Sequence, residues 1–212
     1  GNLPEFARKY PDRVGRLLNS CPIVATPSGY LADKLNPYRN YFELLPNPID
    51  VQKYIYRQIS LPRPSLIWLR SFHGLYNPYL APKIIALLLT NFPDIHITMV
   101  GPDKGDGSLQ ETQRLAQELN VQEHIEFLGA VPKSEVPATL ERGDIFLNTT
   151  NFDNTPVSVL EAMASGLVVV STNVGGIPYL LDHEVDSLLV EPDNPEEIDR
   201  KSTRLNSSHV SQ

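Results

Sequence analysis

The chain has few of the residues that form disulfides or bind metals. Its 212 residues include a single cysteine, Cys21, which cannot form an internal disulfide. We expect this side chain to be a small buried apolar group in a protein from a reducing compartment. The five histidines are scattered without ligand spacing, and no Asp-x-Asp pair is present. The sequence therefore predicts neither a disulfide framework nor a metal site.

Basic residues and long apolar runs are also scarce. The chain has 18 lysines and arginines against 25 acidic residues, which gives a net charge of -7. Binding to the backbone of a nucleic acid requires a basic surface, so no nucleic-acid partner is predicted. The longest apolar run, residues 84–89, is far shorter than the roughly 20 residues of a membrane-spanning helix, and residues 1–5 lack the features of a signal peptide. We therefore expect a cytoplasmic protein.

What the chain does have is a regular alternation of strand-like and helix-like segments between residues 61 and 198. Apolar runs predict strands at 65–69, 95–100, 125–128, 145–148, 168–171 and 188–190. The segments between them predict helices at 78–89, 108–119, 133–142 and 156–164. Continuous Val, Ile and Leu strands separated by helices indicate an α/β fold with a doubly wound parallel sheet. Ligands of such sheets bind beyond the carboxyl ends of the strands.

The two ends of the chain differ from this pattern. Residues 1–45 predict a helix over 6–18, a short strand over 23–26 and a helix over 30–35. No initiator Met precedes them, so we expect the chain to begin inside a longer protein. We expect residues 46–198 to form the sheet domain. Residues 199–212 have no apolar periodicity and look like the translation of a sequencing adapter, so we expect a disordered, artefactual tail.

Two acids, Asp153 and Glu161, are separated by seven residues at a predicted helix start. Thr155 is a good N-cap and Pro156 suits the first helical position, so the helix should begin between the two acids. Free backbone N–H groups at the helix N-terminus can bind a phosphate without a metal, while the carboxylates accept hydrogen bonds from sugar and ribose hydroxyls. The pattern predicts a sugar-nucleotide site. In the alternative interpretation, Glu161 is a solvated helix residue and Asp153 a turn residue.

The segment that follows has a recognisable order. Residues 160–178 read LEAMASGLVVVSTNVGGIP. Together with the two acids, this stretch resembles the E-x7-E signature of retaining GT-B glycosyltransferases, in particular the large family 4 (group 1), with Asp153 in place of the first Glu. Tyr179 stands where the signature normally has another Glu. The resemblance implies a Rossmann-like C-terminal, donor-binding domain of a GT-B protein.

The resemblance also implies a reaction and roles for individual residues. The reaction is a retaining, metal-independent transfer of a sugar from a nucleotide-sugar donor to a glycan or lipid-linked acceptor. No cofactor is implied, because the nucleotide sugar is a substrate. Asp153 would hold the sugar hydroxyls and Glu161 the ribose. The groups implied to hold the diphosphate are the side chain of Arg70 and the backbone amides of Asn154, Thr155 and Val157.

Three other loops match family patterns less completely. Arg70 occupies the place of a phosphate-binding Arg, but the accompanying Lys is missing. Asn77, followed by Pro78, favours a helix N-cap there, and His73 either supplies the missing donor or is a solvated loop histidine. Gly101 resembles the glycine of a family loop that lies beside the nucleotide. In the alternative interpretation, it belongs to a surface turn that requires positive φ. The backbone of Leu128 and Gly129 resembles a segment that lies against the base.

The resemblance assigns residues 1–45 to a remnant of the N-terminal, acceptor-side domain, and residues 45–50 to the crossover between domains. It predicts a hexosyltransferase-type enzyme that is inactive as this fragment alone. With a lipid-linked acceptor, the missing half would place the enzyme peripherally on the inner face of the membrane. Two alternatives stay open: a non-catalytic nucleotide-sugar-binding module that has lost the phosphate-binding Lys, and a GT-B phosphorylase or epimerase.

Overall fold

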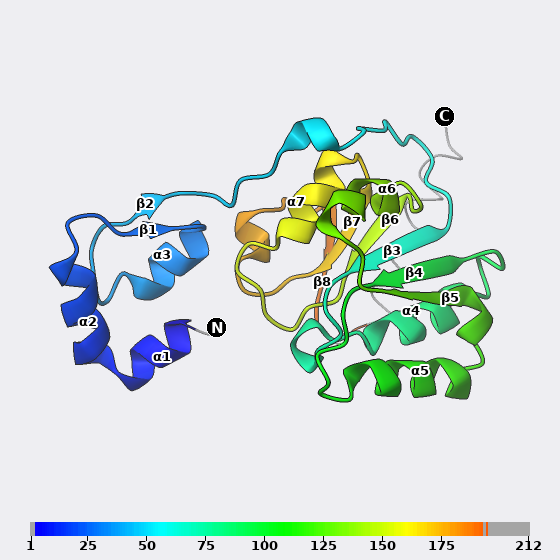
Figure 1. Cartoon of the computed structure of the whole chain (residues 1–212), viewed down its shortest axis with the longest axis horizontal. Coiled ribbons are helices and arrows are strands. Elements are labelled where there is room, and N and C mark those ends of the chain that lie inside the picture. The colour runs from blue at the N-terminus through cyan, green and yellow to red at the C-terminus, as the bar shows by residue number, and fades with distance from the viewer. Residues whose placement is uncertain (1–2, 193, 195–212) are drawn as a thin grey trace.

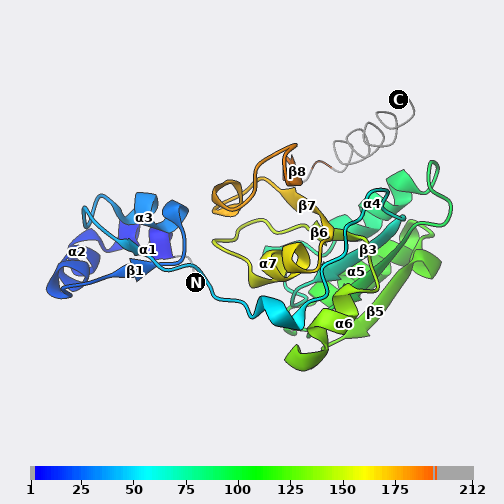
Figure 2. The ribbon, with the colours of Figure 1, turned by 90° about the horizontal axis from the view of Figure 1, so that it is seen from above.

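The computed structural model describes residues 3–192 and 194, in two parts (Figure 1). A small N-terminal lobe, residues 3–45, is joined by an extended segment to a sheet domain. Figure 2 shows this segment, which carries the 3₁₀ helix η1 (Val51–Lys53), running between the two parts. The predicted tail, residues 199–212, lies outside the described residues. Within the described part of the chain, no helix is long and apolar enough to cross a membrane.

The sheet domain is built on six parallel strands in the order β5-β4-β3-β6-β7-β8. The strands are β3 (Ser65–Leu69), β4 (His96–Val100), β5 (Ile125–Gly129), β6 (Ile145–Asn148), β7 (Val168–Thr172) and β8 (Ser187–Val190). Every neighbouring pair is parallel. All six lie where the apolar runs predict them, because a strand that is buried on both faces, as β3 is, has to be apolar throughout.

Helices cover both faces of this sheet. They are α4 (Leu80–Leu88), α5 (Ser108–Glu118), α6 (Val136–Leu140) and α7 (Val157–Ala164), with the 3₁₀ helices η2 (Gly74–Tyr76), η3 (Gln122–His124), η4 (Lys133–Glu135) and η5 (Ile177–Tyr179) in the connections. Successive side chains of a strand point to opposite faces. Leu66 and Trp68 therefore pack with α4 and α5, whereas Ile67 packs with α6 and α7. These two cores confirm the predicted doubly wound α/β sheet.

The N-terminal lobe has a small core of its own, formed by Ala7, Val14 and Leu35. Its elements are α1 (Leu3–Lys9), α2 (Pro11–Ser20), β1 (Ala25–Thr26), α3 (Gly29–Leu35) and β2 (Glu43–Leu44), with β1 and β2 parallel. The prediction of one helix over 6–18 is wrong, because the chain leaves the helical conformation at Tyr10, before Pro11. The prediction of a buried Cys21 is also wrong, since its side chain is exposed.

The predicted start of α4 is corrected as well. Asn77 does not cap this helix, which begins at Leu80. Asn77 instead takes a left-handed conformation with φ of 46°, directly after η2. Asparagine tolerates this conformation better than most residues. Its side-chain amide donates to Asn151 Oδ1 at 3.2 Å, so it ties the loop after β3 to the loop after β6.

Candidate functional site

The sheet has its topological switch point between β3 and β6. From β3 the chain runs outward through β4 to β5, and it then returns to β6 on the other side of β3. Ligands of open α/β sheets bind in the crevice beyond the strand ends at such a point. A pocket of about 230 Å³ lies at this edge of the sheet. Its lining residues end β3 and β4 or follow β3, β4 and β5: Leu69, Arg70, Ser71, Tyr76, Val100, Gly101, Pro102, Val131 and Val136.

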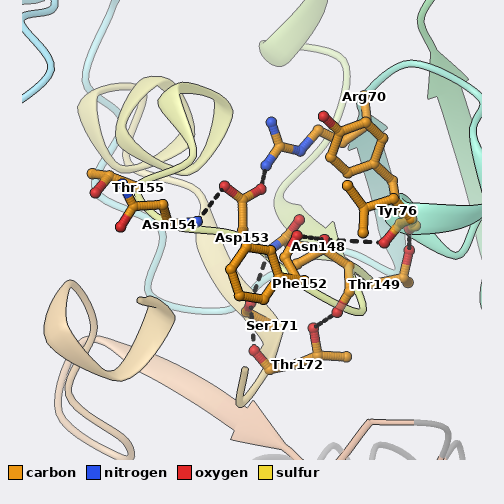
Figure 3. A network of polar contacts seen from close by, with 12 residues as sticks. Arg70, Tyr76, Asn148, Thr149, Phe152, Asp153, Asn154, Thr155, Ser171 and Thr172 are labelled. Atoms are coloured by element: carbon orange, nitrogen blue, oxygen red, sulfur yellow. Dashed lines mark hydrogen bonds and ion pairs between the residues drawn. The ribbon is translucent and has the colours of Figure 1, made fainter. Parts of the chain in front are cut away.

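Arg70 connects this pocket to the acidic loop. It is the first residue after β3, and its side chain is only 16% exposed. The guanidinium lies 4.7 Å from the ring centre of Tyr76 and forms an ion pair with Asp153, which is 15% exposed (Figure 3). The ion pair uses Nη2, while Nε makes no hydrogen bond to the described residues. Burial lowers the pKa of the Arg70 guanidinium, and interactions with Tyr76 and Glu161 oppose that shift.

Glu161 is a buried acid in α7, with 6% of its surface exposed. Its Oε1 accepts a hydrogen bond of 2.9 Å from the hydroxyl of Tyr54, which follows η1 in the linking segment. Burial raises the pKa of the Tyr54 hydroxyl, and the hydrogen bond to Glu161 raises it further. Glu161 is therefore not a solvated helix residue, and that part of the alternative interpretation is wrong.

Two glycines hold the acidic loop in place. The amide of Gly176 donates to the carbonyl of Asp153 at 2.9 Å. A Cβ atom at Gly175 would lie 2.1 Å from that carbonyl oxygen, and one at Gly176 would lie 1.9 Å from the carbonyl oxygen of Asn154. Only glycine permits the turn after β7 to approach the acidic loop so closely.

The N-terminus of α7 differs from the prediction. The helix begins at Val157 with Pro156 as its N-cap, so Thr155 is not the capping residue. Contacts with other segments hold Thr155 instead: its hydroxyl donates to Pro27 O at 3.4 Å, and its carbonyl accepts from Asn47 at 3.0 Å. The amide of Asn154 is not free either, since it donates to Asp153 Oδ1 at 2.8 Å. The diphosphate role of these amides stays a prediction.

The remaining predicted residues are divided between the pocket and its surroundings. Gly101 lines the pocket, with φ of 150°, and a Cβ atom there would lie 1.7 Å from the carbonyl oxygen of Arg70. It therefore allows the loops after β3 and β4 to pass each other. Gly129 accepts a hydrogen bond of 2.8 Å from Gly101, yet neither it nor the half-exposed Leu128 lines the pocket. His73 lies outside the lining as well, and its Nδ1 accepts from the amide of Leu75 at 3.0 Å.

A buried polar network supports the loop after β6 (Figure 3). Thr149 accepts a hydrogen bond from the Trp68 indole at 2.8 Å and donates to the carbonyl of Tyr76 at 2.8 Å. Asn148 donates to Ser171 at 2.9 Å. Sequence interpretation missed these contacts, although polar residues at the end of a buried strand are a signal for them.

The chain matches the family Glycosyl transferases group 1 over residues 67–207. It is 33% identical over 111 residues to a phosphatidylinositol N-acetylglucosaminyltransferase subunit from Arabidopsis thaliana. The matched residues cover 52% of this chain and 24% of that protein. It is 30% identical over 146 residues to the Corynebacterium glutamicum D-inositol 3-phosphate glycosyltransferase, which is 66% of this chain and 34% of that protein. The chain thus spans about a quarter to a third of these relatives.

Solved structures give the same fold. Anabaena HepE in complex with UDP and glucose superposes with a TM-score of 0.72 at 17% identity, covering 89% of this chain and 54% of that one. The C-terminal domain of a Francisella tularensis glycosyl transferase group 1 family protein (LpcC) superposes with a TM-score of 0.65 at 20% identity, covering 76% and 88%. The chain therefore belongs to the group 1 glycosyltransferase family, and its parallel sheet has the fold found in the GT-B enzymes of that family.

Proposed function

We propose that this chain is the donor-binding part of a retaining, metal-independent hexosyltransferase that transfers a sugar from a nucleotide sugar to a glycan or lipid-linked acceptor. The observation that carries the proposal is the buried guanidinium of Arg70, which lies at the pocket with its Nε atom free of hydrogen bonds and its Nη2 atom paired with Asp153. A buried cation attracts a phosphate, and an adjacent carboxylate binds hydroxyl groups. The related fold of HepE holds UDP and glucose, which supports this pairing.

Each group has a distinct task in the proposed reaction. The bond from the sugar C1 to the diphosphate oxygen breaks, and its electron pair stays with the diphosphate. C1 bonds to the oxygen of the acceptor hydroxyl, whose proton passes to the departing diphosphate. Arg70 stabilises the charge that develops on the diphosphate. Asp153 accepts hydrogen bonds from the sugar and Glu161 from the ribose, as two buried carboxylates can. Because Asp153 pairs with Arg70 in this structure, the donor replaces that ion pair.

Calorimetry with UDP, GDP and ADP tests the donor site directly. We expect one of them to bind, and Glu161→Gln to weaken binding roughly ten- to hundredfold, because a charge-assisted hydrogen bond contributes about 1.5 to 3 kcal/mol. Glu118→Gln, on the exposed face of α5, is the matched control and should bind as the unmodified chain does. A folded sample that binds none of the three nucleotides would refute the proposal.

Retention and independence of metal need a separate measurement on a full-length parent. The product's anomeric configuration, read by proton NMR, should match that of the donor sugar, and transfer should continue in excess EDTA. An inverted product or loss of transfer in EDTA would contradict this part of the proposal. Co-sedimentation with vesicles that carry the acceptor lipid tests the proposed peripheral association with a membrane.

A non-catalytic nucleotide-sugar-binding module is the second candidate. The observation that favours it is the low positive charge of the pocket, whose described lining includes Arg70 as its one cation. A single cation can bind a diphosphate, but it stabilises the charge on a departing diphosphate less than two cations would. Donor binding by the full-length parent without transfer or donor hydrolysis would favour this candidate, and turnover would exclude it.

A further inference from the structure

Tyr76 is a pocket residue to which the proposed reaction gives no role. Its side chain lines the same pocket as Arg70, and its ring lies 4.7 Å from the guanidinium. Among the residues that the structure describes, none forms a hydrogen bond with the Tyr76 hydroxyl. The Nε atom of Arg70 also lacks a hydrogen-bond partner, while Nη2 forms the ion pair with Asp153. Two donors without a protein partner thus gather in one pocket beside a buried positive charge, and this arrangement suits an anionic ligand.

The backbone holds Tyr76 firmly in this position. Tyr76 ends the short helix η2, and its carbonyl accepts a hydrogen bond of 2.8 Å from Thr149. The carbonyl of Leu75 accepts from the amide of Asn151 at 2.9 Å, and the amide of Gly74 donates to Asp106 at 2.9 Å. The turn is therefore anchored to the loop after β6 on one side and to the loop after β4 on the other. A side chain on such a turn is placed in advance of ligand binding.

We propose that Tyr76 is a second diphosphate ligand, which donates its hydroxyl hydrogen to a phosphate oxygen while its ring fixes the Arg70 guanidinium beside the same phosphate. The identity of this anion rests on the proposed function. The ring restricts the guanidinium through a cation–π contact, so less side-chain freedom is lost when the anion binds. The hydroxyl donates a hydrogen bond to a phosphate oxygen. Because the hydroxyl is neutral, its burial does not carry the desolvation cost of a second buried cation.

Three variants separate the hydroxyl from the ring. Tyr76→Phe removes only the hydroxyl, Tyr76→Leu removes both contacts, and Tyr79→Phe is the control. Tyr79 lies three residues further on, outside the pocket lining, and its hydroxyl donates to Ser108 at 3.0 Å. Because the Tyr76 hydroxyl has no described protein partner, Tyr76→Phe should fold with an unchanged melting temperature. Calorimetry would use the nucleoside diphosphate that the unmodified chain binds, the matching nucleoside and inorganic pyrophosphate.

We expect Tyr76→Phe to weaken binding of the diphosphate and of pyrophosphate about three- to tenfold, and to leave nucleoside binding unchanged, as the loss of one hydrogen bond to a phosphate predicts. Tyr76→Leu should weaken both phosphate ligands further, and Tyr79→Phe should match the unmodified chain. Diphosphate binding by Tyr76→Phe at full affinity, or an equal loss for the nucleoside, would overturn the inference and leave the proposed function standing. If no nucleotide binds the unmodified chain, the proposed function fails, and the binding of pyrophosphate then tests the anion site alone. Pyrophosphate binding that depends on Tyr76 would support an anion site at this residue. Absence of such binding would overturn the inference.

Discussion

Asp144 is the most heavily paired acid among the described residues of the sheet domain. One carboxylate oxygen accepts from the backbone amide and the Nε of Arg63 at 3.0 and 2.8 Å. The other accepts from Arg63 Nη2 at 2.8 Å and from Arg57 Nη1 at 3.1 Å. These contacts join the linking segment to the start of β6. The hydrogen bonds from Arg63 are the main reason why the pKa of Asp144 is lowered to about 2.

Asp144→Asn should therefore destabilise the protein, by about 2 to 4 kcal/mol at pH 7, because it removes the negative charge and one of the two acceptor oxygens that bind Arg57 and Arg63. An unfolded Asp titrates near 3.9 and the folded group near 2, so its contribution is complete above pH 4 and is lost as the pH falls through 2. Urea unfolding of both proteins at pH 7, 4 and 3 measures this contribution to the free energy of unfolding. The difference between variant and unmodified chain should shrink from pH 4 to pH 3, and a constant difference would contradict the assignment.

Gly176 offers a steric test of the acidic loop. Its φ of -89° is open to any residue, so only the closeness of Asn154 O excludes a side chain there. Gly176→Ala should displace the loop, cost more than about 2 kcal/mol and abolish nucleotide binding. Gly15→Ala is the control, because its Cβ atom would have no neighbour nearer than 4.0 Å and alanine favours a helix by about 0.5 to 1 kcal/mol. Unchanged nucleotide affinity in Gly176→Ala would show that the loop does not depend on this contact.

At the scale of elements, the strands and the start of α5 at Ser108 follow from the sequence, whereas the starts of α4 and α7 do not. β3 and β6 have the predicted bounds, because apolar runs with a turn on each side leave little freedom in placing them. Helix starts depend on side chains that have competing partners. Thr155 contacts the N-terminal lobe and Asn77 contacts the loop after β6, so neither is available as a cap. Such contacts join distant segments and leave no local pattern.

The site was predictable to a similar degree. The order of acid, helix and glycine pair predicts that Asp153 and Glu161 belong together, and the position of Arg70 after the first strand of the sheet domain predicts that it lies nearby. Their partners were not predictable. Tyr54 lies 107 residues before Glu161, and its hydrogen bond to that acid has no signature in the sequence. Tyr76 carries no pattern either, because a tyrosine in a turn is equally suited to packing.

The contact between η5 and α3 allows a prediction for these two elements. Tyr179 donates its hydroxyl to Asp33 at 2.8 Å, and its ring lies 5.8 Å from that of Tyr30. Tyr179→Glu, which restores the acid of the family signature, would place two negative charges together and remove the ring. We expect amide hydrogen exchange in α3 to increase markedly. Tyr179→Phe keeps the ring and should show a much smaller increase in exchange. Equal exchange rates in both variants and the unmodified chain would show that this contact does not stabilise α3.

At the scale of the whole molecule, the N-terminal lobe touches the loop that carries the candidate acids. Ser28 donates to the side chain of Asn154, next to Asp153, and Tyr30 packs against Phe152 with ring centres 6.1 Å apart. The lobe therefore lies at the carboxyl edge of the sheet, where the site is (Figures 1 and 2). Its position and the geometry of the acidic loop are physically connected, so changes in one should alter the other.

The last prediction is that this chain binds a donor nucleotide but transfers no sugar. It spans 34% or less of the relatives described above, and the lobe beside the acidic loop comprises only residues 3–45. An acceptor held at one wall alone is poorly oriented, and orientation contributes up to about 7 to 11 kcal/mol to such reactions. Water that reaches the diphosphate also weakens the effect of Arg70 on the leaving group. A panel of radiolabelled donors, tested on this chain and on a full-length parent, measures both activities, with calorimetry on the same samples as the control for folding and donor binding. Transfer by the parent alone would agree with the prediction, whereas comparable rates from both would show that these residues already contain a complete catalytic site.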